Sequence, residues 1–119
     1  MIIRSHDQRL FHITTVDAWD AARAAGEYRA PSLETEGFIH LSTAAQWLAT
    51  ANRFYRGQRD LVLLVLMPDR LRAEVRYESA DGDAYPHLYG ALELDVVERA
   101  WPLPVEPDGT IAVPAGMAR

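Results

Sequence analysis

The chain has 119 residues, 49% of them apolar, which is enough to bury the core of one domain without disulfides or structural metal. It contains no cysteine, which excludes disulfide frameworks, thiolate metal sites and thiol nucleophiles. The net charge of −5 argues against broad binding of nucleic acid or anionic membrane. No apolar run is long enough to span a bilayer or to form a signal peptide, so we expect a soluble, cytoplasmic protein.

The first half of the chain alternates short apolar runs with helical patterns. In chain order these predict a strand over 10–14, a helix from about 15 to 25, an extended segment over 28–32, a turn or short helical piece over 32–37, a strand over 38–41 and a helix to about 55. Thr15 or Asp17 can cap the first helix, and Gly26 is suited to end it. Thr43 and Gln46 have the spacing of a capping box, which predicts that they open the second helix.

The second half is predicted to consist mostly of strands. These are expected over 61–66, 73–78 and 96–101, with a turn at 81–83 and a structured loop or bulged strand over 85–90. The continuous apolarity of residues 61–66 indicates a central strand covered on both faces. Three prolines and two glycines after residue 103 predict an irregular tail. We therefore expect one α+β domain over residues 1–103, with a bent mixed or antiparallel sheet and two main helices, and a tail over 104–119.

Two histidines occupy similar settings in this pattern. His12 in LFHITT and His40 in EGFIHLST each lie in an apolar run that ends in hydroxyl residues and leads into a helix. Core packing alone gives no reason for this repetition, so we expect the two imidazoles to meet at one site, in a cleft that His87 of the PHLYG segment also lines. The alternative is that each histidine is half-buried and bonded to a backbone carbonyl, with Thr14 and Ser42 serving as helix caps.

These motifs resemble the domain of unknown function 952 family over residues 9–103, and that resemblance implies an ADP-ribosyltransferase-like fold. A more distant resemblance is to the NAD-binding core of RNA 2′-phosphotransferases and rifamycin ADP-ribosyltransferases. Phe11-His12-Ile13-Thr14 falls on their first motif, with Ile13 in place of the usual glycine, and Ile39-His40-Leu41-Ser42 falls on their second.

The resemblance implies a protein that binds NAD or an ADP-ribose-like nucleotide and transfers or hydrolyses ADP-ribose. By this analogy His12 would bond the adenosine ribose, and the Ile13 backbone would bond the nicotinamide amide. Tyr89 would stack under the nicotinamide, and Gly90 would permit close backbone approach. The residues expected to contact the nucleotide are His12, Ile13, Thr14, Ser42, His87, Tyr89 and Gly90.

Cleavage of a nicotinamide glycosidic bond passes through an oxocarbenium-like state, so the reaction needs oriented ribose hydroxyls and a nearby carboxylate. Glu78, at the end of its predicted strand, is the first carboxylate candidate and Glu36 the second. Neutral histidine can both donate to and accept from hydroxyl groups. Glu78 and His40 are therefore the predicted catalytic residues.

Two other classes of function fit the same residues. The chain could be a non-catalytic ligand-binding or interaction module, because a fold does not imply a function. His12, His40 and His87 could instead hold zinc with a fourth position open. Their spacings match no compact ligand motif, so no metal is expected. No exposed heptad or large apolar tail indicates an oligomer interface.

Overall fold

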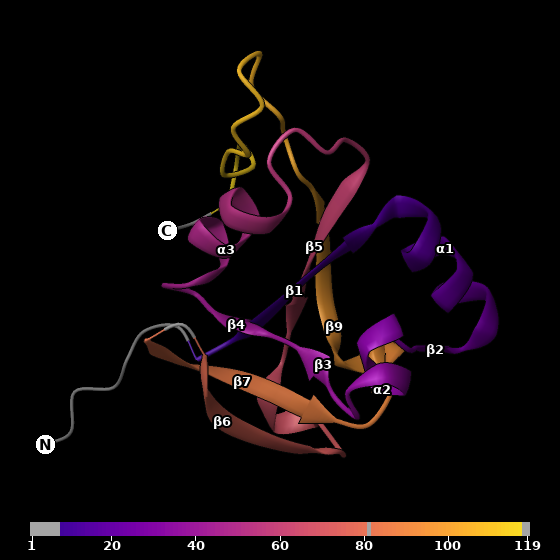
Figure 1. The fold of residues 1–119 in the computed structure, drawn as a ribbon. Helices are drawn as coiled ribbons and strands as arrows, with labels where there is room; N and C mark the ends of the chain where they lie inside the picture. Colours follow the sequence, from indigo (N-terminus) through magenta and orange to yellow (C-terminus); the bar gives the residue numbers. More distant parts are fainter. Residues whose placement is uncertain (1–7, 81, 118–119) are drawn as a thin grey trace, which may run out of the picture.

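The computed structural model describes residues 8–80 and 82–117 (Figure 1). In chain order its elements are β1 (Leu10–Thr15), α1 (Val16–Ala25), β2 (Glu27–Tyr28), α2 (Pro31–Thr35), β3 (Ile39–His40), β4 (Ser42–Thr43), α3 (Trp47–Phe54), β5 (Leu61–Leu66), β6 (Glu74–Ala80), β7 (Asp83–Tyr89), β8 (Leu92–Glu93) and β9 (Val97–Pro102), with 3₁₀ turns at Pro68–Arg70 and Leu94–Val96. The predicted α+β class is confirmed.

The strands form three antiparallel sheets in place of the one bent sheet that we predicted. Their strand orders are β4-β1-β5-β9, β2-β8 and β3-β7-β6. The division falls at Leu41, because β3 before it pairs with β7 while β4 after it pairs with β1. Leu41 itself is buried, and its backbone N–H donates to the Pro86 carbonyl. One short segment thus passes from one sheet to another, which an apolar pattern cannot indicate.

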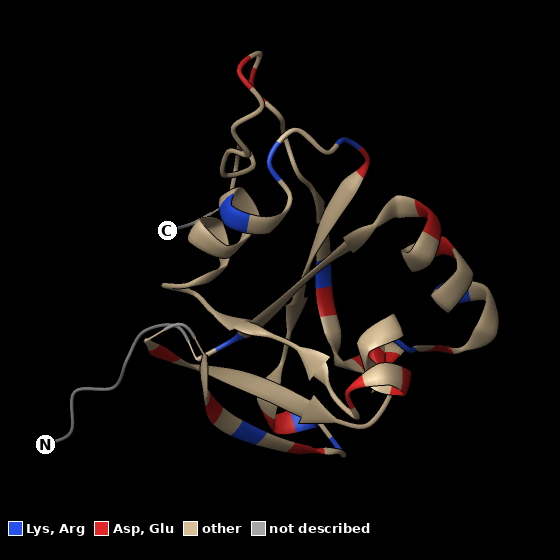
Figure 2. Ribbon diagram, in the orientation of Figure 1, with Lys and Arg blue, Asp and Glu red and all other residues tan. Residues whose placement is uncertain are grey.

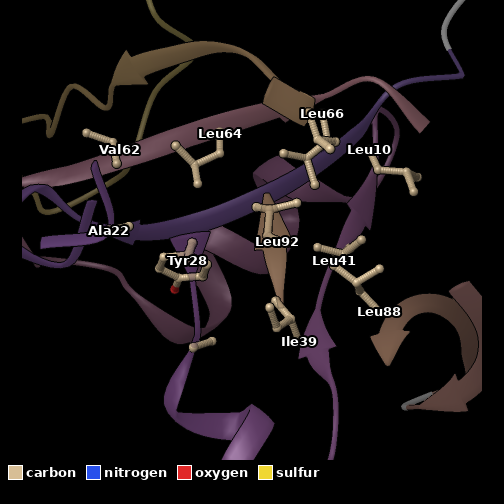
Figure 3. Close-up of a cluster of buried hydrophobic side chains, with 12 residues drawn as sticks. Leu10, Ala22, Tyr28, Ile39, Leu41, Val62, Leu64, Leu66, Leu88 and Leu92 are labelled. Carbon is tan, nitrogen blue, oxygen red and sulfur yellow. The ribbon is translucent and has the colours of Figure 1, made fainter. Parts of the chain in front are cut away.

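Strand β5 is the centre of the core, as its composition predicted. All six of its residues are buried, and it pairs with β1 on one edge and β9 on the other. Because side chains alternate along a strand, Val62, Leu64 and Leu66 face one core cluster, shown in Figure 3, together with Ala22 of α1. The intervening residues of β5 face a second cluster, which contains Trp47 and Ala51 of α3. The two main helices therefore cover opposite faces of this sheet.

The predicted ends of α1 are confirmed, whereas the predicted start of α3 is wrong. The Thr15 side chain accepts a hydrogen bond from the Ala18 N–H, and Gly26 ends α1 with a φ of 94°. The capping-box contact also forms, because the Gln46 side chain accepts from the Thr43 N–H at 3.0 Å. Thr43 pairs with β1, however, so the following residues form a turn and α3 begins only at Trp47.

Of the two alternatives predicted for the PHLYG segment, the strand is confirmed: Pro86–Tyr89 belong to β7, without a bulge in its pairing with β6, and Gly90 follows the strand. Pro86 lies in the middle of this strand, which is itself the middle strand of its sheet. The Pro86 carbonyl accepts from Leu41 N–H, and the nitrogen of an extended residue points to the same side as its carbonyl. The Pro86 nitrogen, which carries no hydrogen, therefore points toward Leu41 and away from β6. The pairing of β7 with β6 thus loses no hydrogen bond.

The segment after residue 103 packs against the second core cluster. Ile111 is only 1% exposed and belongs to this cluster with Phe11 and Trp47. Asn52 of α3 holds the Ile111 backbone from both sides: its Oδ1 accepts from Ile111 N–H at 2.8 Å and its Nδ2 donates to Ile111 O at 2.9 Å. Figure 1 shows this yellow segment beside α3. Its side chains thus contribute to the core, although its backbone contains little regular structure.

Candidate functional site

The antiparallel register of the β3-β7-β6 sheet places polar side chains in one row. His40 of β3 pairs with His87 of β7, and His87 pairs with Arg76 of β6. The alternate residues Ile39 and Leu88 face the first core cluster, so this row lies on the other face of the sheet. We call this surface the histidine face; its residues are Glu36, Phe38, His40, Glu74, Arg76, Glu78, His87 and Tyr89.

Glu78 is the hydrogen-bonding centre of the histidine face. Its Oε1 accepts from the Tyr89 hydroxyl at 2.6 Å and lies 2.7 Å from Nδ1 of His87. The Tyr89 hydroxyl, followed by the His87 ring, holds the pKa of the Glu78 carboxyl below its ordinary value. The same bond raises the pKa of Tyr89. Glu78 is therefore ionised at neutral pH, and the N–H at Nδ1 of His87 donates a hydrogen bond to its carboxylate.

Phe38 orders the rings of this face, and our sequence reasoning did not include it among the site residues. It stacks on His87 with ring centroids 4.0 Å apart and an interplanar angle of 14°. It also contacts the His40 ring edge-on at 4.8 Å and lies 5.3 Å from the Tyr89 ring. A period of two between Phe38 and His40 is the signal that could have placed both on one face.

His40 forms a second, exposed histidine–carboxylate pair. Its Nε2 lies 3.1 Å from Glu36 Oε2, and both side chains are about half exposed. The His40 and His87 rings meet edge-on at 5.3 Å. Arg76, which our sequence reasoning also missed, lies over the Tyr89 ring at 4.6 Å. Figure 2 shows acidic and basic residues alternating along β6, so the face carries carboxylates beside one guanidinium.

His12 does not share this face. It is 8% exposed, its Nδ1 donates to the His40 backbone carbonyl at 2.7 Å, and its Nε2 lies 2.8 Å from the Tyr28 hydroxyl. With Nδ1 donating, Nε2 is an acceptor, so Tyr28 donates to it. The Tyr28 hydroxyl is also 3.0 Å from Thr14 Oγ1. His12 therefore contacts the backbone of residue 40, whereas the His40 imidazole lies on the histidine face, so the expected meeting of the two rings is wrong.

The other predicted residues of the first and second motifs are internal. The Ile13 side chain is buried in the second core cluster, and Ile13 pairs with Leu63 in the β1–β5 ladder. Thr14 is bonded to Tyr28, and Ser42 is buried in β4 opposite Phe11. The cap of α1 is Thr15, so neither Thr14 nor Ser42 caps a helix. Of the predicted site residues, the structure brings together Glu78, His40, His87 and Tyr89.

Gly90 has a packing reason to be glycine. A Cβ atom at this position would lie 2.7 Å from the Cβ of Ala73, which cannot rotate away. We expect Gly90→Ala to lower the free energy of unfolding by roughly 1–3 kcal/mol, as overpacking does. Urea unfolding of Gly90→Ala, Ala73→Gly and the double variant measures this. If the two Cβ atoms clash, the double variant should lose less free energy of unfolding than the two single variants lose in sum. Strictly additive losses would contradict the clash.

Metal ligands do not gather in the part of the chain that the structure describes. Within residues 8–80 and 82–117, no group of three or more His, Cys, Asp or Glu side chains is placed to hold a metal ion. The three histidines do not form the alternative zinc site in this arrangement, because the two ring nitrogens of His12 bond to Tyr28 and to the residue 40 carbonyl.

The fold and the site define a class of small antiparallel α+β protein with a histidine–carboxylate surface on its three-stranded sheet. The chain belongs to the family described as "Protein of unknown function (DUF952)", whose model matches residues 13–100. In the described part of the chain, no helix has the length and apolarity needed to cross a membrane.

Solved structures of one relative share this fold. The crystal structure of protein CC0527 from Caulobacter crescentus is 34% identical, covers 88% of this chain and 94% of its own, and has a TM-score of 0.82. A methionine double mutant of CC0527 gives a TM-score of 0.81 with the same identity and coverage. The solution NMR structure of CC0527 gives 0.75, covering 87% of this chain and 90% of its own. No curated protein matches the chain in sequence.

Proposed function

We propose that this protein binds NAD or an ADP-ribose-like nucleotide on the histidine face and transfers or hydrolyses its ADP-ribose. The observation that carries the proposal is the Glu78 carboxylate, held ionised by Tyr89 and His87 beside a group of aromatic rings. An oxocarbenium-like transition state develops positive charge at the ribose, and a preorganised carboxylate stabilises that charge. Tyr89 and Phe38 supply ring surface for a nicotinamide or adenine.

The division of roles follows from the contacts. Glu78 acts as the catalytic carboxylate, while His40, half exposed at the edge of the face, is placed to bond ribose hydroxyls. His12 supports β3 from behind through the residue 40 carbonyl. A direct bond from His12 to the ligand would require its bonds to Tyr28 or to that carbonyl to open. This proposal therefore relocates the ligand from the first motif to the histidine face.

We expect NAD and ADP-ribose to raise the melting temperature. Binding to the folded state alone adds about 2.7 kcal/mol of stability at a ligand concentration of 100 times Kd. Glu78→Gln should abolish nicotinamide release, because the neutral amide cannot stabilise the charge that develops in the transition state. Glu106→Gln, an exposed change outside the histidine face, is the matched control and should behave as the wild type. No shift with either nucleotide would contradict the proposal.

One observation favours a second candidate, a binding module without catalysis. The first motif, which the resemblance assigns to NAD, is closed in this structure by the bonds of His12 and by the burial of Ile13. A module of this kind would show the nucleotide-dependent rise in melting temperature without releasing nicotinamide. Chromatographic assay of nicotinamide over long incubations separates the two candidates.

A further inference from the structure

We propose that His87 is the general base of the histidine face: its Nε2 accepts the proton of the attacking water or hydroxyl group. This inference rests on the proposed function and extends it, because it assigns the activation of the acceptor to a residue that the resemblance places only among nucleotide contacts. The substrate class is an N-glycosidic nucleotide, attacked at the anomeric carbon of its ribose.

The first support is the state of the two ring nitrogens. His87 is only 7% exposed and its Nδ1 is bonded to Glu78, yet its Nε2 makes no hydrogen bond to any described residue. Among the described residues, the only fully buried side-chain nitrogen or oxygen without a hydrogen-bond partner is Glu93 Oε1, which lies 3.4 Å from Arg72 in an ion pair. His87 Nε2 is not such a fully buried atom, so it keeps its hydrogen-bonding capacity for a molecule other than the described chain.

The second support is the fixed tautomer. The ionised Glu78 carboxylate can only accept a hydrogen bond, so in the neutral imidazole the proton is on Nδ1 and the lone pair is on Nε2. The Tyr89 hydroxyl holds the carboxylate, and the Phe38 ring, stacked at 4.0 Å, holds the plane of the imidazole. A carboxylate that orients a histidine with its second nitrogen free is the arrangement that general-base catalysis requires.

The other two described histidines lack this combination. Nε2 of His12 already accepts from Tyr28 in a buried network. Nε2 of His40 lies against Glu36, and that pair is half exposed, so water competes for both groups. Only the His87 ring is both enclosed and unoccupied at one nitrogen.

The proposed step balances without any further reactant. The water O–H bond breaks and its proton passes to His87 Nε2, while the oxygen forms a bond to the anomeric carbon of the ribose. The bond from that carbon to the nicotinamide nitrogen breaks, and nicotinamide leaves with the electron pair as a neutral molecule. Glu78 stabilises the positive charge that develops on the ribose and on the imidazolium. His87 then returns its proton to solvent.

The pH dependence of the reaction reports on this base. A proton on His87 Nε2 occupies the lone pair that must accept from water, so turnover should fall at acidic pH. The charged and titratable groups facing His87 are Glu78 and Arg76 of β6, Tyr89 of β7, and His40 with its partner Glu36. The pKa of the Glu78 carboxyl is lowered and that of the Arg76 guanidinium is raised, so both groups keep their charges over the neutral range.

The deciding variant is His87→Asn. An asparagine amide can place its N–H near the position of Nδ1 and so keep the donor to Glu78, but it has no group at the position of Nε2. We expect nicotinamide release from NAD to fall at least about 100-fold, with loss of the acid limb of the pH profile. Glu106→Gln should match the wild type in nicotinamide release and in the nucleotide-dependent rise in melting temperature.

A second measurement does not depend on mutation. Long-range ¹H–¹⁵N correlation spectra of the wild type should show the neutral His87 ring protonated at Nδ1. An Nε2-protonated ring, or turnover by a folded His87→Asn variant within a few-fold of wild type, would overturn this inference and leave nucleotide cleavage intact. Absence of both nicotinamide release and a melting-temperature shift in the wild type would instead overturn the proposed function and this step with it.

Discussion

Lowering the pH from 7 to 5 is expected to reduce the free energy of unfolding by about 2 kcal/mol through His12 alone. Burial lowers the pKa of His12 from 6.5 to about 4. Between these two values the unfolded chain binds a proton that the folded chain does not, so stability falls as the pH is lowered. The loss stops below about pH 4, where the folded state takes up the proton too.

Urea unfolding at several pH values between 7 and 5 measures this effect. The carboxylates with lowered pKa, such as Glu78 and Asp83, have ordinary values of 4.5 and 3.8, so their contributions are lost mainly below this range. As a control, an NMR titration of the folded protein should leave the His12 ring signal unshifted above pH 5. Titration of this ring near pH 6.5, or a flat stability profile, would contradict the burial of a neutral His12.

The second large loss of stability is expected from substitution of Ile111, which lies in the segment that the sequence predicted to be an irregular tail. Ile111 is 1% exposed in the second core cluster. Ile111→Ala should lower the free energy of unfolding by about 2–5 kcal/mol, because truncation of a buried aliphatic side chain loses transfer energy and leaves a cavity. Chemical denaturation followed by tryptophan fluorescence measures it, since Trp47 belongs to the same cluster.

Two matched variants make this test specific. Glu106→Ala, an exposed change in the same segment, should alter stability by no more than about 0.5 kcal/mol. Asn52→Ala, which removes both hydrogen bonds to the Ile111 backbone, should cost roughly 1–3 kcal/mol if those groups become buried without partners. Equal, small effects for Ile111→Ala and Glu106→Ala would show that the segment is a detachable tail after all.

Local sequence signals accounted for the elements whose causes are local. The apolar run of β5 predicted a buried central strand, and Thr15 and Gly26 predicted the ends of α1. The same reasoning failed at Thr43, where a correct capping-box contact forms but pairing of Thr43 with β1 delays the helix. A local preference of about 1 kcal/mol loses to a strand pairing that the rest of the fold supports.

In the candidate site, too, the sequence indicated the residue types, whereas contacts between distant segments decided which residues meet. Motif position, a strand end and the family resemblance together singled out His12, His40, His87, Glu78 and Tyr89, and four of these five meet on one face. The sequence could not show that His12 is bonded from within the core, because its partners Tyr28 and the residue 40 carbonyl are distant in the chain. Nor could it show that Phe38 stacks on His87, because these two residues are 49 positions apart in the sequence.

By itself the sequence determined the α+β class, the buried β5 and the kind of residue available for chemistry, because periodicity, caps and composition act within a few neighbouring residues. Only the tertiary structure decided that Leu41 divides the sheets, that Ile111 completes the core and that Glu78, His87 and Tyr89 share hydrogen bonds. These outcomes depend on strand register and on packing between distant segments, and register sets the face on which each side chain lies.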